Sequence, residues 1–270
     1  MSDKEFTPEL LRKRRSPFMD VMHRLAKSPL AMFGLFIILV LVFCAIFAEL
    51  ISPYSPIKQD LLHMFETSSS AHWLGTDEFG RDILSRLIYG ARVSLQVGFI
   101  AVGIALVTGG MLGAISGYYS GKLDNAIMRV MDVLLSIPQT LLAIAIVAAL
   151  GPSLMNLMIA VGISAVPTYA RIVRGSVLSI RSMEFIEAAR AAGSSDLRII
   201  LKHILPNSMA PIIVQSTLGV ASAILNAAGL SFIGLGIQPP NPEWGAMFSR
   251  GRLNFLGDGL RDALDPKLKR

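Results

Sequence analysis

Long apolar runs, separated by short polar segments, dominate the pattern of this 270-residue chain. The run from Leu30 to Ile51 contains no charged residue before Glu49. About 20 consecutive apolar residues are enough to cross the hydrocarbon core of a bilayer as a helix, and a helix in a soluble core rarely needs so many. The pattern therefore predicts an all-α polytopic membrane helix bundle with five visible spans. They cover Leu30 to Ile51, Val93 to Tyr118, Val130 to Leu150, Ser153 to Ala170 and Ser208 to Ile237.

The composition agrees with a membrane protein, because 53% of the residues are hydrophobic and 16% are charged. The first run is too long, and starts too far along the chain, to be the apolar part of a signal peptide, and Ser52-Pro53 is a poor cleavage site. We therefore expect a permanent first span. The single cysteine, Cys44, lies inside it, so the sequence offers no disulfide framework.

Basic residues are concentrated in the tails and loops, so membrane topology explains the net charge of +6 better than nucleic-acid binding does. The positive-inside rule places the tail of residues 1–29 in the cytoplasm. Counting spans from there puts the loop of residues 52–90 on the opposite, extracytoplasmic side. Residues 91–252 form the membrane core, with a cytoplasmic loop at 175–207, and residues 253–270 form the C-terminal tail. The cytoplasmic loop carries Arg181, Arg190, Arg198 and Lys202, in agreement with this count.

Three glycines, Gly109, Gly113 and Gly117, repeat at four-residue spacing inside the second run. They share one face of a helix, where small residues let two helix backbones approach closely. Packing inside one bundle is the favoured interpretation, and a subunit interface is the alternative. Pro138 and Pro167 should interrupt and kink their spans, because proline removes a backbone donor.

Polar side chains occur at membrane depth, where facing lipid without a partner costs several kcal/mol. We therefore expect them to face the interior of the bundle. Hydrogen bonding between helices and lining of a transport path both remain open for each of them. The candidates for lining a path are Gln139, Thr140, Gln215, Thr217 and Asn226.

The passage EAARAAGSSDLRIILKHILP, residues 187–206, is polar although it lies between apolar runs. Helix-forming residues precede Gly193, which is typical of a left-handed helix cap. Ser194 or Ser195 offers an N-cap for a second helix, Leu197 to Leu205, which should stop at Pro206. The sequence thus predicts two short helices that meet at a glycine.

This passage resembles the cytoplasmic motif of permease subunits of bacterial ABC importers, although His203 stands where many relatives have an apolar residue. The resemblance implies that the passage docks on an ATP-hydrolysing partner. The matching positions are Glu187, Ala188, Ala189, Gly193, Leu205 and Pro206. Three further passages, GTDEFGRDILSRLIYGARVSL, GLSFIGLGIQPPNPEWGAM and LGDGLRDALDPKLK, resemble dipeptide, oligopeptide and nickel permeases of the C type.

Membership in this family would imply a multi-pass protein of the bacterial inner membrane with a cytoplasmic N-terminus. Its partners would be a homologous second permease, two ATP-binding subunits and an extracytoplasmic solute-binding protein. ATP and Mg²⁺ would be bound by the partners, with no cofactor bound by this chain, no enzymatic activity of its own and no nucleic acid. Dipeptide, oligopeptide, glutathione and metal chelate all remain possible substrates.

One departure from the family concerns the last span. The resemblance implies six spans, yet Arg252 is followed directly by Leu253 and no apolar run of membrane length remains there. Five spans would leave a basic C-terminal tail outside, against the positive-inside rule. We expect that residues of a sixth span are omitted at this junction, which would place Arg252 and Leu253 at opposite membrane faces. A truncated protein is the alternative.

Other functions explain less of the sequence. A secondary transporter would be expected to carry ionisable groups in mid-membrane, which these runs lack, and an oligomeric channel leaves the cytoplasmic motif unexplained. A hydrolytic or metal site could be imagined in the external loop, but its histidines lack the close pairing of such sites. A surface ion-pair network around Arg81 and Arg86 is the favoured interpretation there, and we expect no metal site. The loop also contains His63, His72, Asp77, Glu78 and Asp82.

Overall fold

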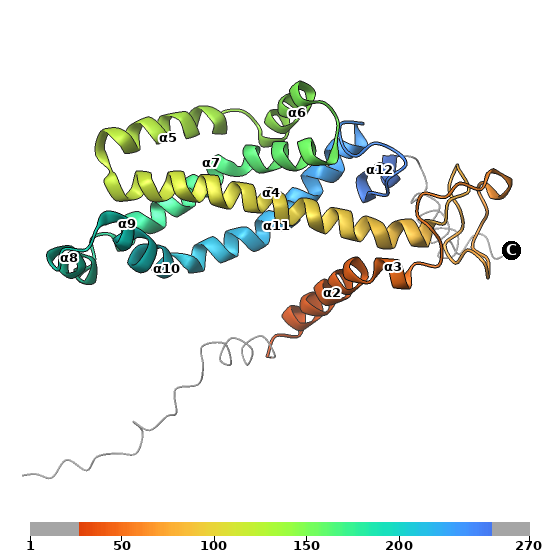
Figure 1. Cartoon of the computed structure of the whole chain (residues 1–270), viewed down its shortest axis with the longest axis horizontal. Coiled ribbons are helices and arrows are strands. Elements are labelled where there is room, and N and C mark those ends of the chain that lie inside the picture. Colours follow the sequence, from red (N-terminus) through yellow and green to blue (C-terminus); the bar gives the residue numbers. More distant parts are fainter. Residues whose placement is uncertain (1–26, 250–270) are drawn as a thin grey trace, which may run out of the picture. The chain divides into compact units, whose positions relative to one another are not determined.

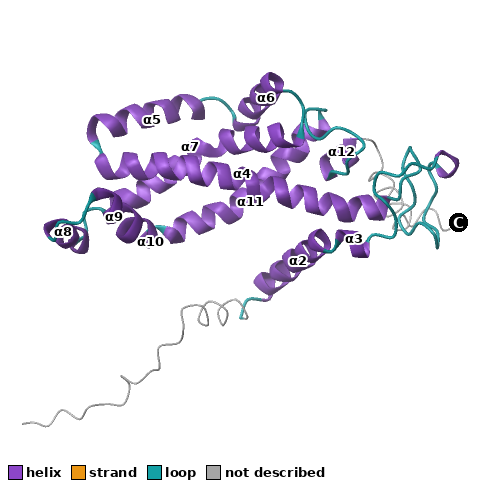
Figure 2. Cartoon of the chain, viewed as in Figure 1, coloured by secondary structure: helices purple, strands orange, loops and turns teal. Residues whose placement is uncertain are grey.

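The computed structural model describes residues 27–249, which form helices joined by loops (Figure 2). Extended pairing within this range is limited to one isolated bridge between Thr76 and Asp82. Four of the described helices are long and apolar enough to cross a membrane, or five if one bent pair counts as a span. These observations confirm the predicted all-α membrane bundle. The expected sixth span and the Arg252–Leu253 junction lie outside the described residues.

The chain divides into two compact units between Phe43 and Cys44, and each unit is described by itself. Helix α2, Pro29–Ile46, crosses this division and contains no charged residue. Helix α3, Ala48–Ile51, follows it after Phe47. The predicted first span, Leu30 to Ile51, is therefore two helices, because the backbone of Phe47 leaves the helical conformation.

Two long helices form the centre of the second unit. Helix α4, Ile83–Tyr119, and helix α7, Leu154–Ile180, share the most extensive contact in the unit (Figure 1). Both extend beyond the predicted apolar runs, because α4 begins ten residues before Val93 and α7 ends ten residues after Ala170. At about 1.5 Å per residue, α4 is longer than the ~30 Å hydrocarbon core. The apolar run therefore marks only the part of each helix that needs to be in lipid.

Polar caps set the beginnings of these helices. The Asp82 carboxylate accepts a hydrogen bond from the Ser85 backbone N–H at 2.7 Å, at the start of α4. At the start of α7, the Ser153 hydroxyl accepts from the Asn156 N–H at 3.1 Å. Such caps satisfy backbone donors that have no partner inside the helix.

The glycine row of α4 faces α7. A Cβ added to Gly113 would lie 2.3 Å from the Ala170 carbonyl oxygen, and one added to Gly109 would lie 2.5 Å from the Val166 carbonyl oxygen. At Gly117 the nearest atom would be the Val177 Cβ, at 2.8 Å. The two backbones thus touch along three turns, and this close approach lies inside the chain.

The predicted third span, Val130 to Leu150, is not one helix. Helix α5, Gly121–Leu135, and helix α6, Gln139–Leu150, meet at an angle of 89°. Pro138 lies at the break, where it has no N–H to continue the helix and disfavours helical geometry in the preceding residue. In contrast, Pro167 lies inside the continuous helix α7, so it does not break its span.

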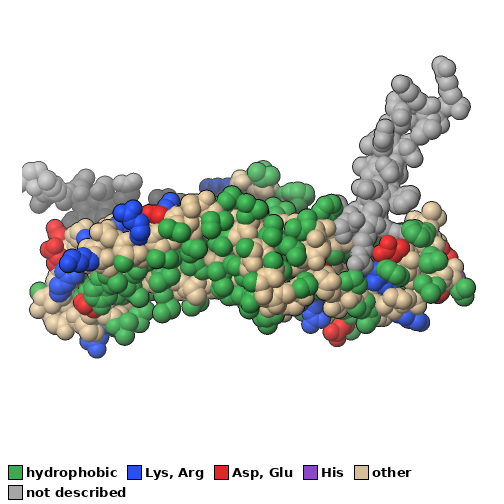
Figure 3. Space-filling model, turned by 90° about the horizontal axis from the view of Figure 1, so that it is seen from above, with side chains coloured by type: hydrophobic (Ala, Val, Ile, Leu, Met, Phe, Trp, Pro, Cys, Tyr) green, Lys and Arg blue, Asp and Glu red, His purple; other side chains and the backbone are tan. Residues whose placement is uncertain are grey.

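Helix α11, Met209–Phe232, is shorter than the predicted run of Ser208 to Ile237, and a loop connects it to α12, Trp244–Ser249. The Trp244 indole N–H donates to the Leu87 carbonyl at 3.1 Å, which ties α12 to α4. On the face shown in Figure 3, charged side chains gather toward the two ends of the bundle, and the band between them is mostly hydrophobic or uncharged. That distribution fits a protein whose middle lies in lipid.

Candidate coupling site and membrane cavity

The motif segment folds as a series of short helices after α7. Helix α8, Glu184–Ala191, ends at Gly193, whose φ of +78° confirms the predicted left-handed cap. The Gly193 N–H donates to the Arg190 carbonyl at 3.0 Å, and the Ser194 N–H donates to the Ala189 carbonyl at 3.1 Å. These two bonds form a Schellman motif, which satisfies carbonyls at the end of a helix. The positive φ, and not a lack of space, favours glycine at position 193, because a Cβ there would meet nothing within 4 Å.

The second short helix does not stop at Pro206, contrary to the prediction. Helix α9, Asp196–Ile199, continues into a π-helical turn, η3, Ile200–Ile204, and then into α10, Leu205–Asn207. The Leu205 N–H donates to the Ile200 carbonyl, five residues earlier. A proline has no N–H for the carbonyl four residues before it, and the wider turn accommodates this loss without ending the helix. Ser195 is the N-cap residue, but its side chain makes no capping hydrogen bond.

One side of this segment, residues 184–207, is anchored to the spans. Ile186, Ile199 and Ile204 have no exposed surface, and Ile200 is also buried. They belong to one apolar cluster with Tyr118 of α4 and with Val173, Val177 and Ile180 of α7. Each buried side chain of this size stabilises the packing by roughly 1.5–3 kcal/mol. The segment is therefore held to the ends of α4 and α7 as a packed unit.

Polar contacts add to this anchoring. The Tyr118 hydroxyl donates to the Asp196 carboxylate at 2.6 Å, joining α4 to α9. The Arg181 guanidinium donates to the carbonyls of Gly117 and Tyr118, each at 3.2 Å, and to the Ser120 hydroxyl. A cation on the last carbonyls of α4 is favourable for the helix dipole. The end of α7 and the start of α9 are thus both held by the end of α4.

The opposite side of the segment is exposed. Glu187, Ala188, Gly193 and Pro206 are exposed, and Ala189 and Leu205 are half-buried. Within residues 27–249 the Glu187 carboxylate forms no ion pair. The segment also exposes large apolar side chains, which are Met183, Phe185, Leu197 and Leu201. Small and apolar groups that face away from an anchored core are typical of a protein contact surface.

A second charged contact holds α5 against α7. The Arg174 guanidinium donates two hydrogen bonds to the Asp124 carboxylate, each at 2.6 Å, and the Ser116 hydroxyl bonds the same carboxylate. A bidentate pair of this kind has fixed geometry as well as attraction. This pair was not predicted from the sequence, although Asp124, the one buried acid of α5, lies in the first turn of that helix.

A cavity of about 80 Å³ lies among α4, α6, α7 and α11. Two of the predicted path residues, Gln139 and Gln215, line it together. Asn226 is half-buried and does not line the cavity. Thr140 and Thr217 are exposed on this chain, and whether they line a path stays a prediction. The Thr217 hydroxyl donates to the Ile213 carbonyl of its own helix, at 2.9 Å.

The sequence analysis missed the other polar groups of the cavity. They are Thr168 and Tyr169 of α7 and Ser222 of α11. The Tyr169 hydroxyl donates to the Gln215 carbonyl at 3.3 Å. A Cβ on Gly219 would lie 2.3 Å from that hydroxyl, so the glycine leaves room for it. Ser222 lies seven residues after Gln215 and four before Asn226 on α11, and this spacing, which puts the three on one side of a helix, could have drawn attention to it.

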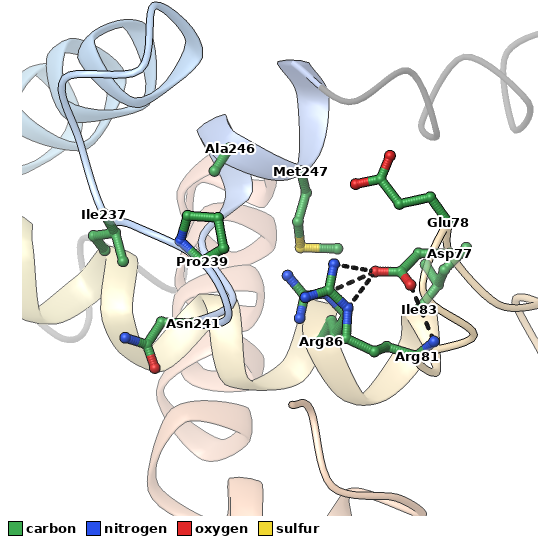
Figure 4. Close-up of a pocket in the computed structure, with 10 residues that line it drawn as sticks. All are labelled: Asp77, Glu78, Arg81, Ile83, Arg86, Ile237, Pro239, Asn241, Ala246 and Met247. Atoms are coloured by element: carbon green, nitrogen blue, oxygen red, sulfur yellow. Dashed lines mark hydrogen bonds and ion pairs between the residues drawn. The ribbon is translucent and has the colours of Figure 1, made fainter. Parts of the chain in front are cut away.

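At the other end of α4, the expected ion-pair network exists but is buried rather than at the surface. One carboxylate oxygen of Asp77 contacts two arginines (Figure 4): Oδ2 is 2.7 Å from the Arg81 guanidinium and 3.5 Å from that of Arg86. Arg81 is only 2% exposed. Burial alone would raise the pKa of Asp77, but hydrogen bonds from Arg81 and from backbone N–H groups outweigh it and lower the pKa.

The same network fixes the loop around it. Arg86 also donates to the carbonyls of Pro56 and Pro240, so one side chain joins three segments. Asp82, besides capping α4, is 2.9 Å from the His72 ring. No group of three or more metal-ligating side chains occurs within residues 27–249. The charges of Asp77, Arg81, Asp82 and Arg86 are used in internal contacts.

Comparison with known proteins gives consistent matches. Residues 109–270 match the family described as binding-protein-dependent transport system inner membrane component, and residues 16–67 match the N-terminal TM domain of oligopeptide transport permease C. The chain is 50% identical to the dipeptide transport system permease protein DppC of Alkalihalophilus pseudofirmus, over 94% of this chain and 91% of the relative. It is 41% identical to the glutathione transport system permease protein GsiD of Pectobacterium atrosepticum, over 94% and 93%.

The alignments also bear on the missing span. The alignment with the Alkalihalophilus protein is 277 positions long but takes in 94% of the 270 residues. The relative therefore has about 20 residues inside the aligned region that have no counterpart here, enough for one membrane span. The position of this difference along the chain stays a prediction.

A solved structure shares the fold. A chain of the MetNI methionine ABC transporter, in an inward-facing conformation, superposes with a TM-score of 0.54 at 20% identity. The match covers 64% of this chain and 82% of that chain. The fold, the family match and the similarity to relatives along nearly the whole chain agree, and the chain belongs to the family of binding-protein-dependent transport system inner membrane components, the multi-pass permease subunits of ABC importers.

Proposed function

We propose that this chain is one of two permeases of an importer for short peptides. The dipeptide, di/tripeptide and glutathione permeases to which it is similar all act on small peptides or a peptide derivative by their names. In this proposal a homologous permease completes the transport path, and an extracytoplasmic solute-binding protein delivers the peptide. Two ATP-binding subunits bind ATP and Mg²⁺ and supply the energy, while this chain binds no cofactor of its own.

The observation that carries the coupling role is the two-sided construction of residues 184–207. One side is packed on α4 and α7 through buried isoleucines, and the other exposes the motif residues Glu187, Ala188 and Gly193. A rigid element of this kind can pass a displacement at its exposed side to the spans. We therefore assign its exposed side to the ATP-binding partner.

The proposed orientation follows from charge. Residues 171–202 carry six arginines and lysines at the end of the bundle where α8 lies, and the N-terminal tail is also basic. Cytoplasmic loops of membrane proteins have such an excess of positive charge. We accordingly place α8 and the N-terminus in the cytoplasm, and the loop of residues 52–82 on the side of the solute-binding protein.

A matched pair of glycine substitutions tests the coupling role. A Cβ enters open space at both Gly193 and Gly175, but only Gly193 has a positive φ. Alanine in the left-handed conformation costs about 1–2 kcal/mol, so Gly193→Ala should lower the equilibrium constant for forming this cap roughly tenfold. We expect reduced peptide uptake and reduced receptor-stimulated ATP hydrolysis in proteoliposomes that contain the whole importer. Gly175→Ala should behave like the unaltered chain.

Accessibility gives an independent readout. Ala188→Cys should be shielded from a water-soluble thiol reagent when the ATP-binding subunits are present, whereas Leu62→Cys should react equally with or without them, because Leu62 is 92% exposed in the other loop. Equal labelling of Ala188→Cys in both preparations, or normal coupling in Gly193→Ala, would contradict the proposal. Uptake that continues without ATP but stops when an ion gradient across the membrane is dissipated would instead support a secondary transporter.

A further inference from the structure

The cavity among α4, α6, α7 and α11 lies at the middle of the membrane-spanning helices. It is reached by residues 101–102 of α4, 161–169 of α7 and 215–223 of α11, which are all central in their helices. The first residue of α6 also lines it, directly after the bend at Pro138. The bend thus brings the start of α6, and the side chain of Gln139, to the depth at which α4, α7 and α11 cross.

The lining is polar but uncharged. Among the residues that line the cavity, the polar side chains carry carboxamides or hydroxyls, and none is ionised. The side chains of Gln139, Thr168, Gln215 and Ser222 make no hydrogen bond within residues 27–249. Unsatisfied amide and hydroxyl groups in an apolar medium cost several kcal/mol. Two of these four side chains are half-buried and two are exposed on this chain. Because lipid at this depth supplies no hydrogen bonds, water, a ligand or a partner chain has to complete theirs.

The cavity is only part of a site. Its volume of about 80 Å³ is well below the ~300 Å³ of small-molecule pockets. Gln139 and Ser222 are exposed on this chain, so the cavity opens onto the chain's own surface. A homologous permease at that surface would enlarge the space, and a ligand would then contact both chains.

We propose that Gln139, Thr168, Gln215 and Ser222 form a half-site that hydrogen-bonds the backbone amides of a peptide as it crosses the membrane. The inference rests on the proposed function, because it takes a peptide as the substrate. Every residue of a peptide presents an N–H and a C=O, and carboxamides can both donate to and accept from them. The half-site therefore binds what all peptides have in common.

The absence of charge on the half-site has a second consequence. A fixed charge in a low-dielectric region attracts one sign of ligand and repels the other strongly. Neutral groups make no such distinction. The half-site therefore passes acidic and basic peptides alike, and any selection by charge is made before the peptide reaches it.

Charge substitution at Gln139 tests this directly. Uptake of Ala-Ala, Ala-Asp and Ala-Lys is measured with the whole importer in proteoliposomes, and each value is divided by that of the unaltered importer, which removes the preference of the solute-binding protein. Gln139→Glu should lower the ratio of Ala-Asp to Ala-Lys uptake about tenfold, and Gln139→Lys should raise it by a similar factor. Thr108→Glu and Thr108→Lys are the controls, because Thr108 is an uncharged polar residue of α4 that does not line the cavity.

Each outcome decides the proposal. Opposite shifts at Gln139 and none at Thr108 support it, and equal ratios in active Glu and Lys variants at Gln139 overturn it. If the charged variants fail to assemble, Gln215→Ala replaces them. A parallel, several-fold loss of uptake of all three peptides, with receptor-stimulated ATP hydrolysis retained, then supports the half-site, and unchanged uptake overturns it. An unaltered importer that takes up none of the peptides overturns the proposed function itself, and this inference with it.

Discussion

The contact between α4 and α7 can be tested at Gly113, because a single added methyl group would meet backbone there. The Cβ of Gly113→Ala would lie 2.3 Å from the Ala170 carbonyl oxygen and 3.0 Å from the Arg174 nitrogen. Ordinary van der Waals contact begins at 3.4 Å. The two helices must therefore separate by roughly 1 Å, which forfeits a quarter to a half of the dispersion energy at each contact between them.

The expected loss of stability in Gly113→Ala is measured against a control substitution on the same helix. Alanine favours a helix over glycine by up to ~1 kcal/mol, so Gly→Ala in α4 has a gain as well as a penalty. Gly103→Ala shares the gain but not the penalty, because a Cβ there would meet nothing within 4 Å. The difference between the two variants therefore isolates the overpacking, for which we expect about 1–3 kcal/mol.

The assay is thermal unfolding of the purified importer in detergent, followed for this chain. Gly113→Ala should unfold at a lower temperature than Gly103→Ala. The nearest distances at Gly109, 2.5 Å, and Gly117, 2.8 Å, rank their alanine variants as progressively milder. Equal stability of Gly113→Ala and Gly103→Ala, or the reverse order along the row, would refute the argument that backbone contact fixes these glycines.

Two further predictions concern the ends of α4. Asp77→Asn should destabilise the chain at pH 7 by about 3–5 kcal/mol, because it leaves the buried Arg81 cation without its carboxylate. The pKa of Asp77 is lowered in the folded chain, so the ion pair stabilises the fold above the unfolded pKa near 4, and this stabilisation is lost as the pH falls through the folded pKa. The unaltered chain should therefore unfold at a higher temperature than Asp77→Asn at pH 7, and the two should unfold alike in acid. A difference that does not change with pH would contradict this. Tyr118→Phe removes the 2.6 Å hydrogen bond to Asp196 and should raise the number of ATP molecules hydrolysed per peptide while costing only about 1 kcal/mol of stability. Asp196→Asn, which keeps an acceptor, should retain most of the coupling, and normal stoichiometry in Tyr118→Phe would exclude the bond from the coupling route.

The sequence predicted the embedded parts of the spans well, because crossing lipid requires a continuous apolar run. The ends of the helices were predicted poorly for a physical reason. The residues that start α4 and α7, Asp82 and Ser153, are polar caps whose effect depends on a single hydrogen bond each. The charges beyond the runs then form internal contacts. Arg81 was expected at the surface but is buried, which only the folded loop around it could reveal.

Three prolines show that the effect of a proline on a helix depends on its surroundings. The same chemistry, a missing N–H, breaks the helix at Pro138, is accommodated inside α7 at Pro167 and is absorbed by a π-helical turn before Pro206. Pro167 is buried in the contact with the neighbouring helices, whereas Pro138 is exposed. Packing on both sides of a helix can hold it together through a buried proline. Pro206 is exposed, and there the wider π-helical turn before it keeps the helix continuous instead. The outcome is therefore a property of the tertiary structure and not of the residue.

The predicted interruption at Pro138 is confirmed, but the size of the bend, 89°, could not be predicted from the sequence, and the cavity depends on it. An unbroken span of Val130 to Leu150 would have carried Gln139 along one straight helix, with no reason to meet Gln215 of α11. The 89° bend makes Gln139 the first residue of a new helix, and there it shares a cavity with Gln215. Natural proteins tend to depart from regular patterns at functional positions. The break in the most irregular span therefore supports the assignment of the half-site, since the irregular backbone lines a polar cavity rather than lipid.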